Sequence, residues 1–297
     1  MADVSRRDAG KLLLAGGAAA LLTAGAAAGA SKINSVVSGV QLGVQSWSFR
    51  DRPLDACIAA LKQVGVNECE LSEVHLTTPN PPGPDLDPKR LDTPLSIYRD
   101  VRKKFDVAGV SLSAYGNNFE PHYTDQVIER GFQLAQAMGL DCITSSTKIG
   151  MVPRIDRFAQ KYKIKVGYHN HDRSNDPEEF ATAEGFERVL RSSSEYTRIN
   201  LDIGHFVAAN QDPIAFLRKH YAKIVTLHIK DRKRNHGPNV PFGQGDTPIA
   251  EVLRLVRDNH WKFPANIEYE YQKYAPGLDN LVEVKKCYAY CRHALES

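Results

Sequence analysis

The sequence predicts a single (β/α)₈ barrel, and three observations support this fold. Strand-like and helical segments alternate eight times after residue 39, and no change of composition marks a second domain. Strict β–α alternation favours a parallel sheet, and eight units favour its closure into a barrel. Several of the later strands end in histidines or carboxylates, and a barrel brings the C-terminal ends of its strands to one rim. We therefore expect the barrel to span residues 40–297.

The strands are predicted from short apolar runs separated by helical patterns. In order they are Val40–Trp47, Glu68–Ser72, Val110–Tyr115, Asp141–Ser145, Ile164–Asn170, Arg198–Gly204, Ile224–Lys230 and Ala265–Glu270. Apolar and polar residues alternate along them. In the seventh strand, Val225, Leu227 and Ile229 share one face, and the other face carries Thr226, His228 and Lys230. The apolar faces would pack against helices, which leaves the polar faces pointing into the barrel.

The helices are predicted from apolar residues at helical spacing and from their first residues. Several begin with Pro directly after Asp or Thr, as at Asp176-Pro177 and Asp212-Pro213, and this is a favourable start for a helix. The predicted helices are Leu54–Val64, Pro94–Ala108, Thr124–Met138, Pro153–Tyr162, Pro177–Arg191, Pro213–His220, Pro248–His260 and Leu278–Ala294. The Pro-rich stretch from Thr77 to Thr93 is predicted to be a long loop over the rim.

Residues 1–30 are predicted to be an export signal. Ser5-Arg6-Arg7-Asp8 precedes an apolar stretch from Leu12 to Ala27 that is rich in alanine and glycine, and small residues follow before Ser31. Paired arginines before a weakly hydrophobic core resemble a twin-arginine signal. The alternative is a membrane anchor, but alanine and glycine contribute little insertion energy, so we expect no stable span after cleavage. Residues 31–39 would then be a polar linker, and the protein would be periplasmic.

Composition and cysteine usage exclude some classes of protein. The chain is 42% hydrophobic and 25% charged with a formal net charge of +3, which is ordinary for a globular domain. Its basic residues are interspersed with acids, so we expect no nucleic-acid partner. The five cysteines form no CxxC pair, and we expect them to be buried rather than disulfide-bonded.

Four residues at strand ends are predicted to bind one divalent metal ion. His169, Asp202, His228 and Glu268 lie roughly 25 to 40 residues apart, which is the length of one βα unit. They would form a shell of nitrogen and oxygen ligands with a charge of minus two, suited to Mn²⁺, Co²⁺, Zn²⁺ or Mg²⁺. For any one of them alone, the alternative is an interior residue held by hydrogen bonds.

Two more histidines lie beside these ligands. His171 follows His169 by two residues, and His205 follows Asp202 by three. Each could bind substrate hydroxyls or move protons near neutral pH. Each could instead orient a metal ligand.

Other candidates come from the remaining polar faces. Glu70 could contact substrate, act as a base or hold a second metal ion. Lys230 could polarise a carbonyl group or neutralise an enolate, or it could simply pair with Asp231. Trp47 could offer its face to a sugar ring, although barrel core is the alternative. Glu270 lies one pleat beyond Glu268 and could replace it as a ligand.

The strings YHNHD, LDIGH, HIKD, GQGD and IEYE, within the span from Val40 to Ala294, resemble the sugar phosphate isomerase/epimerase superfamily. These xylose isomerase-like TIM barrels also include endonuclease IV. The resemblance implies a metal bound by a Glu, an Asp, a His and a Glu on the fifth to eighth strands. The last three positions fall on Asp202, His228 and Glu268. The fifth-strand position falls on His169, where this chain departs from the pattern.

That departure changes the expected chemistry. The resemblance implies two-base epimerisation by two metal-bound glutamates, and a histidine at one of these positions favours one-sided chemistry. We expect deprotonation beside a ketone with His171, Glu268 and Lys230 as catalytic residues, followed by reprotonation or β-elimination. Glu70, His205, Trp47 and Lys230 would bind the substrate, an unphosphorylated sugar or keto-sugar such as a 3-keto-glycoside.

Two other functions stay open on the sequence alone. The first is a sugar-binding barrel that has lost catalysis. The second is an endonuclease IV-like cleavage of abasic DNA, which would need a three-metal cluster and a basic surface. A homo-oligomer is compatible with all three functions.

Overall fold

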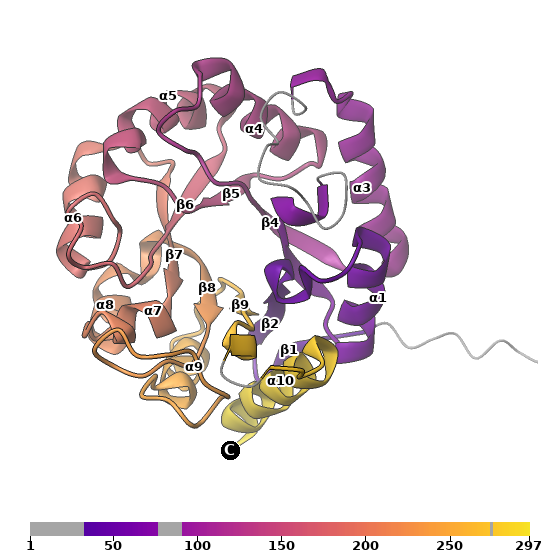
Figure 1. Cartoon of the computed structure of the whole chain (residues 1–297), viewed down its shortest axis with the longest axis vertical. Helices are drawn as coiled ribbons and strands as arrows, with labels where there is room; N and C mark the ends of the chain where they lie inside the picture. Colours follow the sequence, from indigo (N-terminus) through magenta and orange to yellow (C-terminus); the bar gives the residue numbers. More distant parts are fainter. Residues whose placement is uncertain (1–32, 77–90, 274–275) are drawn as a thin grey trace, which may run out of the picture. The chain divides into compact units, whose positions relative to one another are not determined.

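The computed structural model describes residues 33–76, 91–273 and 276–297, and these form a closed (β/α)₈ barrel. The predicted export signal and most of the predicted Pro-rich loop lie outside the described residues. Parallel strands β2 to β9 pair in chain order, and β2 also pairs with β9, which closes the ring (Figure 1). The predicted fold is therefore confirmed.

The strands follow the apolar runs of the sequence. They are β1 (Val36–Val37), β2 (Val40–Gln45), β3 (Glu68–Ser72), β4 (Ser111–Gly116), β5 (Cys142–Ser145), β6 (Lys165–His169), β7 (Thr197–Asp202), β8 (Ile224–Ile229) and β9 (Ala265–Ile267). Leu42 and Val44 of β2 are fully buried, like Leu227 and Ile229 of β8. Such residues join the strands to the surrounding helices in one apolar core.

The helices surround the strands as an outer layer (Figure 1). The α-helices are α1 (Leu54–Val64), α3 (Leu95–Ala108), α4 (Asp125–Ala137), α5 (Val152–Tyr162), α6 (Ala183–Ser192), α7 (Ile203–Ala208), α8 (Pro213–His220), α9 (Ile249–Asp258) and α10 (Asn280–Glu296). Short 3₁₀ helices are η1 (Ser46–Phe49), η2 (Glu73–Leu76), η3 (Ile149–Met151), η4 (Tyr221–Lys223) and η5 (Tyr271–Lys273).

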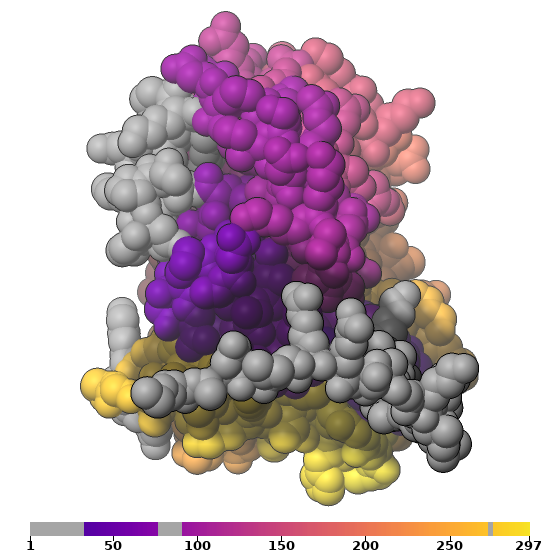
Figure 2. All heavy atoms as spheres, turned by 90° about the vertical axis from the view of Figure 1, so that its right-hand side faces the viewer, coloured from indigo at the N-terminus to yellow at the C-terminus, as the bar shows by residue number. Residues whose placement is uncertain are grey.

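The last helix completes the outer layer. Helix α10 contacts both α9 and α1, so the C-terminal helix lies beside the first one. In the side view of Figure 2, the helices of the first half of the chain lie above the yellow C-terminal segment that includes α10. No helix among the described residues is both long enough and apolar enough to cross a membrane.

The prediction of a linker over residues 31–39 is wrong for its second half. Strand β1 pairs antiparallel with β2, and Ser35 before it is fully buried. The Ser35 hydroxyl donates to the Leu42 carbonyl (2.7 Å), and its backbone N–H donates to Asn67 Oδ1 (3.0 Å). This segment therefore belongs to the barrel, because it satisfies polar groups at the start of β2 and before β3.

Three strands end two or three residues earlier than predicted. Strand β2 ends at Gln45. The Gln45 side chain accepts a hydrogen bond from the N–H of Trp47 and thereby caps η1, which begins at Ser46. Strand β7 ends at Asp202, because its carboxylate caps α7 by accepting from His205 N–H (2.7 Å). Strand β9 ends at Ile267. The predicted helix from Pro177 begins only at Ala183, where Thr182 caps it.

Two bulges break the strict alternation of faces. The pairing of β3 with β4 skips Ser113, and the pairing of β7 with β8 skips Val225. A Cβ on Gly167 would lie 2.5 Å from Val225 Cγ2, so Val225 packs against the inward-facing Gly167. The predicted outward position of Val225 is therefore wrong. Inward Thr226 and His228 keep their predicted face, pairing with Asn200 and Asp202 of β7.

The cysteines are as predicted. All five are free and buried. Burial raises the pKa of the Cys57 thiol to about 12, and the same cause raises the pKa values of the others, so all five remain protonated and unreactive at neutral pH.

Candidate metal centre and active site

Four buried side-chain atoms meet where the barrel strands end. His169 ends β6, Asp202 ends β7, His228 lies in β8 and Glu268 directly follows β9. Each residue offers one ligand atom, and the four atoms lie within 4.8 Å of one another. The structure therefore brings together the four residues predicted from strand-end spacing.

The donor atoms of this cluster fit a divalent metal ion. His169 Nδ1 is buried and has no hydrogen-bond partner in the described part of the chain. Glu268 Oε2 lies 3.0 Å from both His228 Nδ1 and Lys230 Nζ, and Asp202 Oδ2 lies 3.1 Å from Lys230 Nζ. Buried polar atoms without partners are rare in folded proteins. Two imidazole nitrogens and two carboxylate oxygens form a donor set that fits Zn²⁺, Mn²⁺ or Co²⁺. The cluster can therefore hold a divalent metal ion.

His228 is oriented from inside the barrel. Glu70 on β3 places Oε2 3.0 Å from His228 Nε2, and the Asn200 side-chain amide lies 3.1 Å from the same nitrogen. Glu70 is fully buried, and its Oε1 accepts from Gln45 (2.6 Å) and Thr144 (2.5 Å). With Nε2 held in this way, Nδ1 of His228 is directed at the cluster. Glu70 thus lies beneath the site and supports His228, as carboxylates commonly do for metal-binding histidines.

Electrostatics keeps His169 and Glu268 in forms that suit a metal ion, whereas it favours the protonated form of His228. Burial lowers the pKa of His169 well below its usual value, so its imidazole is neutral. Although burial opposes ionisation, Lys230 and His228 hold the pKa of Glu268 well below its usual value. For His228, the nearby Glu70 and Glu268 outweigh burial and raise its pKa. Metal binding at His228 Nδ1 must therefore release a proton.

A second group of three histidines is less suited to a metal ion. His169, His171 and His205 could also direct one nitrogen each at a common point. However, both ring nitrogens of His205 face cations. Arg232 Nη1 lies 2.5 Å from Nδ1, and Lys230 Nζ lies 3.1 Å from Nε2. This group has no carboxylate to offset those charges, so the four-residue cluster is the better metal site.

Lys230 is buried among carboxylates rather than paired with Asp231. Its ammonium lies 3.1 Å from Asp202 Oδ2, 3.0 Å from Glu268 Oε2 and 2.6 Å from Glu270 Oε2. Although burial favours the neutral amine, these carboxylates raise the pKa of Lys230, which is therefore a permanent cation. Asp231 instead accepts backbone N–H groups of Gly243 and Gly245.

Trp47 and Glu270 form one wall beside Lys230. The Trp47 indole donates to Glu270 Oε1 (2.8 Å), and the Arg50 guanidinium lies over the Trp47 ring, 4.9 Å from its centroid. Trp47 is half-buried and held in place on η1. Glu270 is not in the metal cluster; it links Trp47 to Lys230 instead.

His171 is the most exposed of the histidines at the site. Its side chain is 28% exposed, against 10% for His205, and its ring centroid lies 5.1 Å from that of His169. His171 Nδ1 lies 3.7 Å from Glu179 Oε2. The nearby His171, Lys148 and Arg173 lower the pKa of Glu179 to about 2, so this carboxylate is charged at neutral pH.

Sequence analysis did not identify Glu179, Arg232 and Asp172 as site residues. Arg232 Nη1 lies 2.9 Å from Asp172 Oδ1, and this pair buttresses His205. Asp172 ends the YHNHD string, and Arg232 lies in the basic run from Lys230 to Arg234. Their roles depend on which loops meet in space, so spacing along the chain gave no direct signal.

Comparison with models of protein families shows the family of this chain. Residues 58–289 match the family model described as Xylose isomerase-like TIM barrel. The chain belongs to this family. The resemblance inferred from the strand-end strings is therefore confirmed at the level of the family.

Solved structures share the fold of this xylose isomerase-like barrel at low identity. L-ribulose 3-epimerase is 14% identical with a TM-score of 0.66, over 86% of this chain and 95% of that one. The IOLI protein with a binding zinc atom is 13% identical with a TM-score of 0.66, over 86% and 98%. The probable 3-DHS dehydratase AsbF of Bacillus anthracis is 13% identical with a TM-score of 0.62, over 86% and 98%. The comparison with curated protein sequences gives no significant match.

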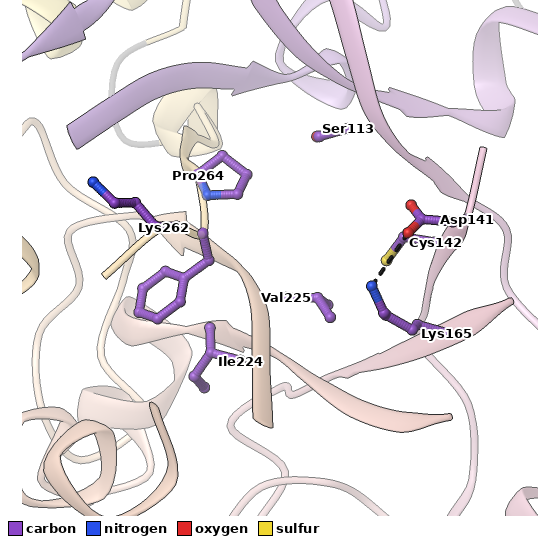
Figure 3. Close-up of a pocket in the computed structure, with 9 residues that line it drawn as sticks. Ser113, Asp141, Cys142, Lys165, Ile224, Val225, Lys262 and Pro264 are labelled. Atoms are coloured by element: carbon purple, nitrogen blue, oxygen red, sulfur yellow. Dashed lines mark hydrogen bonds and ion pairs between the residues drawn. The ribbon is translucent and has the colours of Figure 1, made fainter. Parts of the chain in front are cut away.

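A pocket of about 340 Å³ lies at the other end of this xylose isomerase-like barrel. Figure 3 shows it among residues that start strands, including Cys142 of β5, Lys165 of β6 and Ile224 of β8. The bulge residues Ser113 and Val225 also line it. The metal cluster lies at strand ends, so this pocket is separate from it.

Proposed function

We propose that this protein is a divalent-metal-dependent enzyme that removes a proton next to the carbonyl group of an unphosphorylated sugar or keto-sugar. Reprotonation would give isomerisation or epimerisation, and loss of a β-substituent would give elimination. The observation that carries the proposal is the group of four buried ligand atoms within 4.8 Å of one another, beside a buried ammonium and an accessible imidazole.

The metal ion would be held by His169, Asp202, His228 and Glu268. When bound, it would supply Lewis-acid polarisation of the substrate carbonyl. The remaining chemistry would fall to side chains around it, and each has a defined place in the structure.

His171 is the best-placed base for the carbon-bound proton. Its partial exposure gives access to substrate, and Glu179 would stabilise the imidazolium that forms. The C–H bond breaks, the proton goes to His171, and the electron pair becomes part of an enolate. Lys230 would donate a hydrogen bond to the enolate oxygen, because Glu270 holds its ammonium at the site (2.6 Å).

Trp47 would provide one apolar wall for the sugar ring. Its indole nitrogen is fixed by Glu270, so the ring has a defined orientation. His205, held by Arg232 and Asp172, would contact substrate hydroxyls. Glu70 would act through His228, since its carboxylate is fully buried and hydrogen-bonded beneath it.

His169 favours a base on one side of the substrate. A neutral imidazole bound to a metal cannot take up a proton as a metal-bound glutamate can, so of the two glutamate positions in the family pattern only Glu268 keeps a carboxylate base. An epimerase and a dehydratase both occur among the proteins that share this fold. Both outcomes are compatible with a first step of proton removal next to a carbonyl group.

Hydrogen exchange tests this proposal without knowledge of the final product. The protein would be incubated in D₂O with a panel of ketoses and 3-keto-glycosides and with added Mn²⁺, Co²⁺ or Zn²⁺. We expect NMR to show deuterium at the carbon next to the carbonyl of at least one compound. His171→Ala should reduce the exchange about 100-fold or more while keeping the metal.

The opposite result would favour a non-catalytic sugar-binding barrel. That result is a metal-free protein as purified, no exchange with any compound and no gain from added metal. Failure to bind or cut a duplex with an abasic site would dispose of the endonuclease alternative.

We also propose that the chain is exported through a twin-arginine signal at residues 1–30. The paired Arg6 and Arg7 and the weakly hydrophobic stretch after them support this proposal. Periplasmic export fits an unphosphorylated substrate, because few sugar phosphates occur there.

A further inference from the structure

Lys230 shares its contacts with the predicted metal ligands. Its ammonium lies 3.1 Å from Asp202 Oδ2 and 3.0 Å from Glu268 Oε2, and these are the two carboxylate oxygens that would bind the metal ion. Lys230 is only 2% exposed, so water does not screen its charge effectively.

The Lys230 ammonium and a bound metal ion would compete for the negative charge of Asp202 and Glu268. Zinc binds carboxylate oxygens at about 2.0–2.2 Å. A metal ion on these two oxygens would therefore lie close to an ammonium already about 3 Å from each of them. The repulsion between a divalent ion and a buried ammonium at such a separation is large in a poorly screened site.

Lys230 also has contacts outside the metal ligand set. Its shortest contact is with Glu270 Oε2 (2.6 Å), and His205 Nε2 lies 3.1 Å away. Glu270 is tied in turn to the Trp47 indole. The ammonium can therefore give up Asp202 and Glu268 to a metal ion and still have partners.

We propose that Lys230 is a resident counter-cation that limits the affinity of the site for its metal ion and stabilises the carboxylates when the ion is absent. This inference rests on the metal site of the proposed function, and it concerns affinity and exchange rather than the chemical step. Asp202, Glu268 and Glu270 supply three negative charges around one ammonium. Removal of that ammonium leaves more negative charge for a divalent ion.

Metal titration of neutral variants tests the inference. The probe is Co²⁺ alone, added to metal-depleted protein without substrate and followed by calorimetry and by its visible absorption. Lys230→Met should bind Co²⁺ about tenfold more tightly or better than the wild type, because one nearby positive charge is lost. Lys230→Arg keeps the charge and should stay near the wild-type affinity.

Two further variants serve as controls. Lys219→Met changes an exposed lysine that pairs with Glu187 on the helical layer, and it should leave Co²⁺ affinity unchanged. Lys230→Gln is a second neutral variant that can still hydrogen-bond to Glu270, and it keeps the test usable if Lys230→Met does not fold. Metal-depleted Lys230→Gln should also melt at a lower temperature than the wild type, and Co²⁺ should reverse this loss.

The outcomes separate this inference from the proposed function. Equal or weaker Co²⁺ binding by both neutral variants overturns the counter-cation role while leaving the metal site intact. No Co²⁺ binding by the wild type or by any variant overturns the metal site itself, and with it the proposed function.

Discussion

At the scale of single residues, the buried polar side chains inside this barrel differ in the contacts that surround them. Glu70 is satisfied by Gln45, Thr144 and His228. Glu68, two residues earlier on the same inward face, is buried beside Glu70, Ser113 and Asn266. Burial, with the nearby charge of Glu70, raises the pKa of Glu68 to about 8. Glu68 is therefore largely protonated at pH 7.

The raised pKa of Glu68 predicts a pH dependence of stability. An unfolded glutamate has a pKa of about 4.5, so between pH 4.5 and 8 the folded chain holds one more proton than the unfolded chain. The free energy of unfolding should then fall as pH rises through this window, by up to about 1.4 kcal/mol per pH unit from this group. Glu68→Gln should remove that contribution, so the variant gains stability relative to the wild type from pH 5 to pH 8.

Urea unfolding at pH 5, 6, 7 and 8 measures this difference, and the other titrating groups cancel in the comparison. Glu296→Gln changes a residue on the exposed end of α10. Its free energy of unfolding should change with pH in parallel with that of the wild type. Parallel curves for Glu68→Gln as well would show that Glu68 titrates normally.

Residue type and strand-end spacing were enough to predict which four side chains meet in a cluster that could hold a metal ion. They were not enough to predict the partners of those residues. Glu179 reaches His171 from a loop, and Arg232 reaches His205 from another. These contacts depend on how loops of different βα units fold over the rim, and no periodic pattern encodes that.

At the scale of elements, the helical and strand periodicity of apolar residues predicted most of the strands and helices of the barrel. The errors lie where a side chain competes with the regular backbone pattern. The Asp202 carboxylate ends β7 by capping α7, a helix that was not predicted. A bulge at Val225 turns that residue toward Gly167, since the glycine leaves room for it. Bulges depend on the register between neighbouring strands, which a single strand sequence does not contain.

Asp202 uses one oxygen to cap α7 and would use the other for the proposed metal ion, and substitutions can separate these roles. Asn is also a good N-cap, so Asp202→Asn should keep α7 but bind Co²⁺ at least 100-fold more weakly than the wild type. Asp202→Ala loses both functions and should be about 1 kcal/mol less stable than Asp202→Asn in the metal-free state. Calorimetric titration and urea unfolding measure the two effects. Full metal occupancy in Asp202→Asn would show that the ligand set is wrong.

At the scale of the whole molecule, closure of the ring brings together residues that are distant in sequence. Glu70 contacts His228 across 158 positions, and Trp47 contacts Glu270 across 223. Strand number and order were predictable because each βα unit repeats the same pattern. That residues 33–39 belong to the barrel was not predictable, because their sequence resembles a linker. In the structure, β1 within this segment pairs with β2.

Export is the prediction that concerns the full chain. Replacement of both Arg6 and Arg7 by lysine should abolish transport, because the paired arginines are the recognised part of a twin-arginine signal. In fractionated bacterial cells, the wild type should appear in the periplasm, shorter by about 30 residues as expected for a cleaved signal peptide. The double variant should stay in the cytoplasm at full length. An unchanged distribution would contradict the signal assignment.

The order of the ligands along the chain bears on biosynthesis. His169, Asp202 and His228 are synthesised before Glu268, which follows the last strand of the barrel. On the proposal above, the coordination shell is complete only when β9 has paired with β2 and β8. Metal acquisition would then be a late event that marks a finished barrel. A chain truncated before residue 265 would carry three ligands and no closed ring, and the cell could distinguish it from the mature protein by its empty site.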